Sequence, residues 1–233
     1  MCLEAPSRSN FGENVAAVHD HLHVRDVVFI WELRQILARS PTMSFVHSIL
    51  LRAFGRPRGV MGKLGGFIMA STNHTCAVWV IGLLDIKPND KVLEVGFGPG
   101  LGIRLAAGLT STGYVAGVDP SNEMIAQATA RNEDAIKARR VDLRLGSAGS
   151  LPFEDNVFDK ALAINSMQIW PDAVAGLREM QRVTKEGGII ALGFTPYSGQ
   201  PKDRLPEILT TAGLTNARVV ESEEGFCSLA INP

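Results

Sequence analysis

The feature that most constrains the fold of this chain is the stretch of residues 92–100, which reads Val-Leu-Glu-Val-Gly-Phe-Gly-Pro-Gly. Its first half is an apolar run of strand formers, and its second half places a glycine at every other position. A buried parallel strand has such a run, and glycine marks backbone that turns tightly or approaches a ligand. Because residues 101–109 then carry apolar side chains at helical spacing, we predict a strand, a glycine loop and a helix. The loop amides and the helix N-terminus suit a polar, electron-rich ligand group.

The spacing of the glycines separates two kinds of nucleotide ligand. A dinucleotide fingerprint needs Gly-x-Gly-x-x-Gly, and its third glycine would fall on Leu101 or Ile103 in the two possible registers. The pattern present is Glu-x-Gly-x-Gly-x-Gly, from Glu94 to Gly100. It resembles motif I of the class I S-adenosylmethionine (SAM) dependent methyltransferases. An NAD(P)-dependent oxidoreductase is the alternative that this spacing disfavours.

A second strand, residues 114–119, ends in an acid. An acid at this point can accept hydrogen bonds from both hydroxyls of a ribose. The segment Asp119-Pro120-Ser121-Asn122-Glu123-Met124 resembles the second motif of the same family. The competing interpretation makes Asp119 an ordinary helix N-cap, but Ser121 is the better candidate for that cap, and one helix is predicted from about 121 to 138.

A third strand, residues 141–145, leads into a segment that resembles the third motif of the family. Where the family usually has an acid that bonds the adenine amine, this chain has Ser147, and the amide of Ala148 is a second possible partner of the ring. The resemblance therefore implies a cofactor site for SAM. Its residues are Glu94, Gly96, Gly98, Gly100, Asp119, Pro120, Ser147, Ala148 and Asn165.

The remaining strands define the fold class. Residues 158–164 and 189–194 read as a fourth and a fifth strand, and residues 217–221 and 226–231 are joined by a turn so short that they must be antiparallel. We therefore expect an α/β fold with a Rossmann-like, doubly wound sheet of seven strands, mostly parallel with a C-terminal antiparallel hairpin. The resemblance covers about residues 43–231 and is closest to the small-molecule ("type 11") group, which includes the quinone-biosynthesis methyltransferases.

The chain divides into three predicted parts: an N-terminal extension of uncertain role (1–42), a helical lid or cap (43–86) and a SAM-binding core (87–233). The residues between Leu33 and Leu84 include no Asp or Glu. Their basic and apolar side chains suit a lid, a membrane or lipid-like contact through residues 43–68, or nucleic acid. His19 and His23 have the i, i+4 spacing of two metal ligands, but no further ligand cluster supports them, and no metal is expected.

The candidates for catalysis lie at the end of the fourth strand and before the first. Asn165, Trp170 and His74 are placed there by the resemblance, and a general base is optional because the sulfonium methyl is already activated. The end of the fourth strand lacks the Asp/Asn-Pro-Pro-aromatic motif of enzymes that methylate base amines, so nucleic acid is disfavoured. Three widely spaced cysteines favour a reducing, cytoplasmic location. The sequence thus predicts a SAM-dependent methyltransferase with a small-molecule acceptor; a SAM-binding protein without transferase activity is the alternative.

Overall fold

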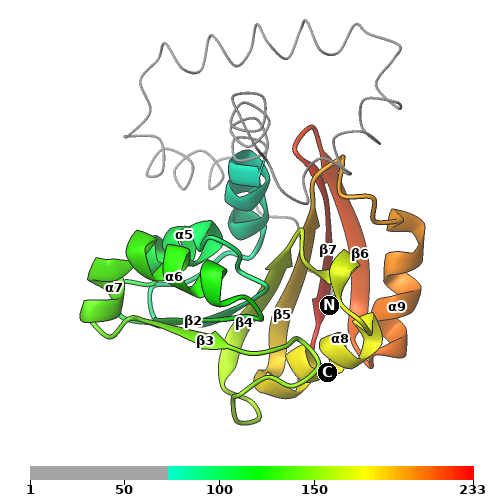
Figure 1. Cartoon of the computed structure of the whole chain (residues 1–233). Helices are drawn as coiled ribbons and strands as arrows, with labels where there is room; N and C mark the ends of the chain where they lie inside the picture. Colours follow the sequence, from blue (N-terminus) through cyan, green and yellow to red (C-terminus); the bar gives the residue numbers. More distant parts are fainter. Residues whose placement is uncertain (1–72) are drawn as a thin grey trace, which may run out of the picture. The chain divides into compact units, whose positions relative to one another are not determined.

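The computed structural model describes residues 73–233, which belong to one compact unit (Figure 1). The predicted extension 1–42, the paired histidines in it, and residues 43–72 of the predicted lid lie outside this part. Residues 73–83 form a helix. The elements that follow it are β1 (Lys91–Val95), α5 (Leu101–Leu109), β2 (Tyr114–Asp119), α6 (Asn122–Arg131), α7 (Glu133–Lys137), β3 (Val141–Leu145), β4 (Phe158–Ile164), η1 (Met167–Ile169), α8 (Ala173–Val183), β5 (Thr184–Phe194), η2 (Lys202–Arg204), α9 (Leu205–Thr211), β6 (Thr215–Ser222) and β7 (Gly225–Ile231).

The seven strands form one sheet in the order β3-β2-β1-β4-β5-β7-β6. Strands β1 to β5 run parallel, and β7 is antiparallel to both β5 and β6. This order reverses at β1, which places the ends of β1 and β4 at the switch point where ligands of such sheets bind. The predicted seven-stranded fold with its terminal hairpin is confirmed.

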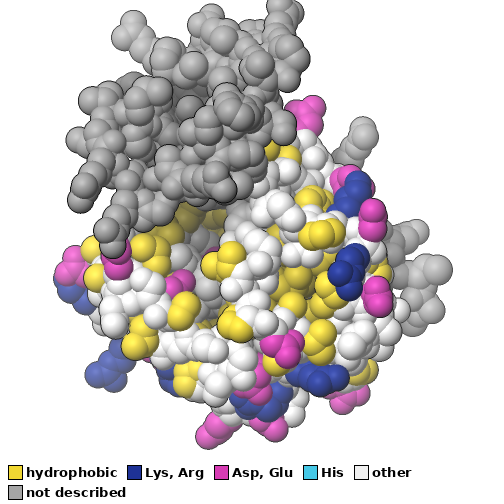
Figure 2. All heavy atoms as spheres, turned by 45° about the vertical axis from the view of Figure 1, so that its right-hand side comes forward, with side chains coloured by type: hydrophobic (Ala, Val, Ile, Leu, Met, Phe, Trp, Pro, Cys, Tyr) yellow, Lys and Arg dark blue, Asp and Glu magenta, His cyan; other side chains and the backbone are white. Residues whose placement is uncertain are grey.

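Helices cover both faces of the sheet (Figure 1). One buried core lies between the sheet and α8 and α9, with Leu177, Met180, Leu205 and Leu209 fully buried. The second core lies between the opposite face and the helix 73–83 together with α5 and α6. Outside these cores, the face drawn in Figure 2 carries its hydrophobic side chains in small groups among uncharged and charged ones.

The predicted helix 121–138 is wrong as a single helix, because it is divided at Asn132 into α6 and α7. The side-chain amide of Asn132 is buried and donates hydrogen bonds to the carbonyl of Gly100 (3.0 Å) and to that of Ala128 (2.9 Å). The break therefore places a side chain under the glycine loop and fixes where that loop meets α6.

Strand β5 begins five residues earlier than the predicted strand 189–194, at Thr184. Thr184 pairs with Phe158 of β4, and the register then shifts before the regular ladder begins at Lys160 and Ile189. The irregularity contains Gly187, whose φ of 75° lies in the left-handed region. None of the helices between residues 73 and 233 has the length and apolar character that a bilayer crossing requires.

Candidate functional site

The glycine loop joins β1 to α5 through three residues with left-handed backbone, Gly96, Gly98 and Gly100, at φ of 73°, 52° and 79°. Two of them are also in close contact with neighbouring elements. A Cβ on Gly96 would lie 1.8 Å from Oγ of Ser166, and a Cβ on Gly100 would lie 2.5 Å from the Cβ of Ala128. Only glycine therefore lets the loop approach both the end of β4 and the side of α6.

Gly98, the middle glycine, has different surroundings. A Cβ built on it would meet no atom of residues 73–233 within 4 Å, so this part of the chain leaves the crest of the loop open. Its backbone N–H donates to the Asp119 carboxylate (2.9 Å) at the end of β2. A loop whose inner positions are packed and whose crest is open leaves room for the bound group that the sequence predicted.

Asp119 is a buried acid that organises two chain segments at once. Its Oδ2 accepts the N–H of Gly98, and its Oδ1 accepts the N–H of Ser121 at 2.9 Å. Ser121 itself is the N-cap of α6, because its Oγ accepts the N–H of Met124, as predicted. Each carboxylate oxygen has a further lone pair, so the ribose role predicted for Asp119 is compatible with both backbone bonds.

Glu94, on β1, is almost completely buried, with 4% of its surface exposed, and its Oε2 has no hydrogen-bond partner among residues 73–233. The carboxyl lies under the first turn of α5, where a Cβ on Gly102 would come within 2.3 Å of Oε1. Burial, and to a smaller extent the charge of Asp119, raises the pKa of Glu94 to about 8, although the N–H of Ile103 bonds the carboxyl and acts in the opposite direction. Glu94 is therefore mainly protonated at neutral pH.

The predicted adenine residues lie at the ends of β2 and β3. The N–H of Gly146 donates to the carbonyl of Asp119 (3.1 Å), which fixes the two strand ends against each other. Ser147 is exposed, and its Oγ accepts the N–H of Gly149 (3.2 Å), while Ala148 packs against the core and Pro120 is exposed. This arrangement leaves Ser147 and Pro120 accessible beside the loop.

Sequence reasoning missed a clamp that holds the segment after Ser147. The Arg182 guanidinium donates to the carbonyls of Leu151 (3.0 Å) and Phe153 (2.8 Å) and pairs with Glu179 and Asp155, each at 2.7 Å. The N–H of Leu151 donates to the other Glu179 oxygen (2.7 Å). The sequence around Arg182 does not indicate these partners, which lie as far as 31 residues earlier in the chain.

Asn165 joins three elements at the carboxyl edge of the sheet. Its Oδ1 accepts the N–H of Thr195 (2.9 Å) and the Thr195 hydroxyl (3.2 Å), and its Nδ2 donates to Oδ1 of Asn73 (2.9 Å). The residue also has a positive φ of 48°. Asn165 therefore ties the ends of β4 and β5 to the helix 73–83, in which His74 follows Asn73 and is half-buried.

The third catalytic candidate, Trp170, is a packed side chain. Its indole N–H donates to Oγ of Ser166 (2.8 Å), and its ring lies against Gly176 of α8, where a Cβ would come within 2.5 Å of the ring. Ser166 in turn lies against Gly96. Trp170 thus holds Ser166 in place against the glycine loop.

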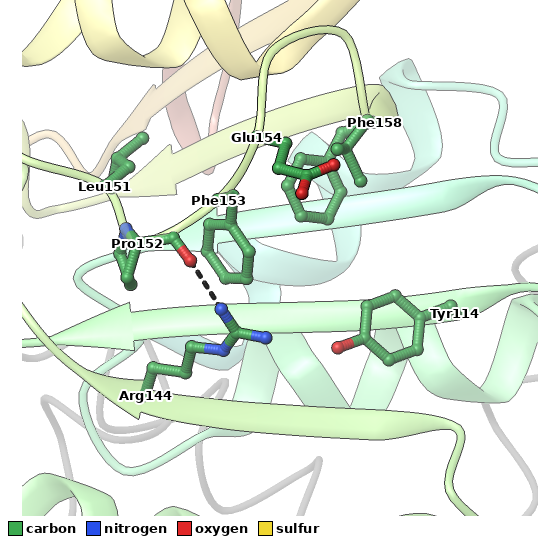
Figure 3. Close-up of a pocket in the computed structure, with 8 residues that line it drawn as sticks. Tyr114, Arg144, Leu151, Pro152, Phe153, Glu154 and Phe158 are labelled. Atoms are coloured by element: carbon green, nitrogen blue, oxygen red, sulfur yellow. Dashed lines mark hydrogen bonds between the residues drawn. The ribbon is translucent and has the colours of Figure 1, made fainter.

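A separate pocket of about 580 Å³ lies on the sheet between β2, β3 and the β3–β4 connection (Figure 3). None of the predicted cofactor or catalytic residues lines it. The Arg144 guanidinium lies 4.4 Å from the centre of the Phe153 ring and bonds the carbonyl of Pro152, while the Tyr114 hydroxyl donates to Asp142 (3.0 Å). Because the Arg144 guanidinium and the Tyr114 hydroxyl already have partners, and none of the predicted site residues lines the pocket, it is a weaker candidate than the strand ends.

Comparison with known proteins covers the segment that contains the glycine loop and Asp119. Residues 93–192, from the middle of β1 into β5, match a family model described as a methyltransferase domain. The uncharacterized methyltransferase YdaC of Bacillus subtilis (strain 168) is 33% identical over 133 residues, which cover 57% of this chain and 71% of YdaC. This chain belongs to the SAM-dependent methyltransferase family. The cofactor of that family is SAM.

Two further similarities are shorter or more distant. A demethylmenaquinone methyltransferase of Bacillus cereus (strain AH187) is 37% identical over 107 residues, which cover 46% of this chain and 45% of that protein. The chain thus spans less than half the length of that relative. The crystal structure of a SAM-dependent methyltransferase from Aquifex aeolicus superimposes with a TM-score of 0.61 at 22% identity, over 67% of this chain and 89% of that one. At that identity the likeness shows the fold.

Proposed function

We propose that this protein transfers the methyl group of SAM to a small-molecule acceptor by in-line displacement. The observation that carries the proposal is the open space at the crest of the glycine loop, next to the Asp119 carboxylate. The glycine loop of residues 96–100 would lie against the methionine part of SAM, Asp119 would hold its ribose, and Ser147 with the Ala148 amide would hold its adenine. Bound there, SAM supplies a methyl group that is activated by its sulfonium charge.

The contribution of the chain itself would be alignment. Asn165 fixes the ends of β4 and β5 beside the loop, so an acceptor held by the segments that follow these strands would meet the methyl group in one orientation. Proximity and orientation of this kind contribute up to roughly 7–11 kcal/mol to catalysis. No side chain is assigned as a general base, which suits acceptors that ionise readily.

Substitution of Gly98 tests the cofactor site without disturbing its packing. Gly98→Ala and Gly187→Ala place a methyl group at positive φ (52° and 75°), where no atom of the described part of the chain lies within 4 Å, so both cost a similar strain of about 1–2 kcal/mol. Only Gly98 faces the proposed cofactor space. We expect the wild type to bind SAM with a dissociation constant in the micromolar range, about -8 kcal/mol. Calorimetry should show SAM binding lost in Gly98→Ala and kept in Gly187→Ala, and equal affinities would contradict the site.

Transfer itself needs a second measurement, because a SAM-binding protein without transferase activity would pass the first. The full chain should be incubated with SAM labelled in its methyl group and with pools of small molecules. Demethylmenaquinone belongs among them because a relative is named for it. Labelled product is expected from the wild type and absent from Gly98→Ala. Binding of NADH in place of SAM would instead favour an oxidoreductase.

A further inference from the structure

Helix α6 holds the glycine loop at two points, one near each end of the helix. Near its first end, the Asp119 carboxylate accepts the N–H of Gly98 (2.9 Å) and that of Ser121, the N-cap of α6 (2.9 Å). At the other end, Asn132 follows the last residue of α6, and its Nδ2 donates to the carbonyl of Gly100 (3.0 Å). Two glycines of the loop are thus attached to opposite ends of the same helix.

The hydrogen bond from Asn132 fixes the residue at which the loop becomes α5. Gly100 is the N-cap of α5, has a φ of 79° and has no side chain that could cap the helix. Its carbonyl accepts the first hydrogen bond of α5, from the N–H of Arg104 (3.2 Å), as well as the bond from Asn132. A side chain 32 residues later in the chain therefore supplies a constraint that glycine itself cannot supply.

Asn132 is separated from the proposed cofactor space. It is buried, with 4% of its surface exposed, and it meets Gly100 on the side that packs against α6, where a Cβ would lie 2.8 Å from Nδ2. The second hydrogen of Nδ2 is donated to the Ala128 carbonyl (2.9 Å), so the amide has no donor left for a ligand. Any effect of Asn132 on SAM must therefore pass through the loop.

The loop needs such a constraint because its glycines are conformationally permissive. Gly96, Gly98 and Gly100 all have left-handed backbone, and glycine populates positive φ only about as readily as negative φ. A loop free to leave this conformation receives SAM only during the fraction of time that it spends there, and the apparent affinity falls by that fraction. The Asp119 carboxylate is shared with the ribose in the proposed complex, whereas the Asn132 amide bonds only the protein.

We propose that Asn132 is a positioning residue for SAM, which acts through the Gly100 carbonyl and keeps residues 96–100 in the conformation that binds the cofactor. The inference rests on the proposed function and adds to it a residue that sets cofactor affinity without touching the cofactor. The alternative is that Asn132 only stabilises the fold, as a buried, hydrogen-bonded amide does elsewhere in this chain.

Asn232 provides the matched control for that alternative. It is 7% exposed, and its Nδ2 also donates to two backbone carbonyls, those of Gln181 (3.1 Å) and Thr184 (2.6 Å). Thr184 is the first residue of β5, at the edge of the sheet opposite to the glycine loop. Asn132→Ala and Asn232→Ala therefore remove the same atoms and the same kind of hydrogen bonds, and only Asn132→Ala changes the loop.

Calorimetry with S-adenosylhomocysteine, the product of methyl transfer from SAM, compares these variants in the full chain. We expect its dissociation constant to rise about tenfold in Asn132→Ala and to stay within about twofold of the wild type in Asn232→Ala. A second variant, Asn132→Ser, keeps a hydroxyl that can bond the Ala128 carbonyl four residues earlier, but this side chain is one bond shorter and leaves the Gly100 carbonyl unbonded. It should weaken binding to a similar degree, and it carries the test if Asn132→Ala does not fold in urea titrations.

Hydrogen exchange of the ligand-free proteins shows whether the effect passes through the loop. The amides of residues 96–104 should exchange faster in both Asn132 variants and at the wild-type rate in Asn232→Ala. Equal dissociation constants in the Asn132 and Asn232 variants, or weaker binding with unchanged exchange in residues 96–104, would overturn the positioning role. A wild type that does not bind S-adenosylhomocysteine, or that binds it no more tightly than Gly98→Ala, would instead refute the proposed cofactor site, so the two proposals fail separately.

Discussion

Replacing Glu94 with glutamine measures how the buried carboxyl of β1 couples folding to pH. The pKa of this group is raised from 4.5 to about 8 in the folded protein, mainly by burial. Between these values the folded protein holds a proton that the unfolded chain has released. Stability from this group is therefore fully present below about pH 4.5 and falls as pH rises toward 8. In this range each pH unit lowers the free energy of unfolding by about 1.4 kcal/mol. The loss of stability between about pH 5 and pH 8 is therefore about 3–4 kcal/mol.

Glu94→Gln should remove this dependence. Glutamine keeps an oxygen for the N–H of Ile103 and never carries a negative charge, so the variant should equal the wild type near pH 5 and exceed its stability at pH 8 by about 3 kcal/mol. Urea unfolding of the full chain at several pH values gives the free energy of unfolding of both proteins. Their difference cancels every other titrating group. Glu123→Gln, at an exposed acid on α6, is the matched control, because it removes a carboxylate that the fold does not bury.

A wild type that gains stability relative to Glu94→Gln as pH rises would refute the reasoning. That result would mean that the carboxyl is ionised and favourably paired in the folded protein. A difference that does not change with pH would mean that the pKa of Glu94 is the same in the folded and unfolded chains.

Three further changes have expected outcomes. Asp119→Asn replaces a carboxylate oxygen with a donor that opposes a backbone N–H, so the SAM dissociation constant in calorimetry should rise about tenfold or more; an unchanged constant would remove the ribose assignment. Gly96→Ala forces a methyl group onto Oγ of Ser166 and should lower the free energy of unfolding by about 2–4 kcal/mol in urea titrations. A loss below about 1 kcal/mol would show that the loop can move away from Ser166. Asn165→Gly and Asn156→Gly both relieve a positive φ, but only Asn165→Gly removes the hydrogen bonds that connect β4, β5 and the helix 73–83. Hydrogen exchange should therefore accelerate in residues 73–83 for Asn165→Gly alone. Equal exchange in both variants would show that Asn165 does not hold this helix.

The parts of the fold that sequence could predict were those encoded locally. The alternating glycines, the acid that ends β2 and the Ser121 cap follow from residue types within a few positions, and all were found where expected. The break at Asn132 was not predictable because it depends on a hydrogen bond to a carbonyl 32 residues earlier in the chain. The same applies to the Arg182 clamp, whose partners reach back 31 residues to Leu151.

The candidate site divides in the same way. Asn165 was singled out by its position after β4, but its bonds to Asn73 and Thr195 connect residues 92 and 30 positions apart and appear only when the chain is folded. Residue types therefore predicted which strand ends form the candidate site, and the structure showed which atoms there already make hydrogen bonds within the protein.

The contact between Ser166 and Gly96 has a consequence for anyone who wishes to redirect this protein to a new acceptor. The hydroxyl of Ser166 is held on one side by Trp170 and leaves no space for a Cβ on Gly96 at the other. A larger side chain at position 166 would press directly on the glycine loop, so a library at this end of β4 would change cofactor affinity together with acceptor choice. Natural relatives that differ at position 166 are therefore expected to have changed the loop as well.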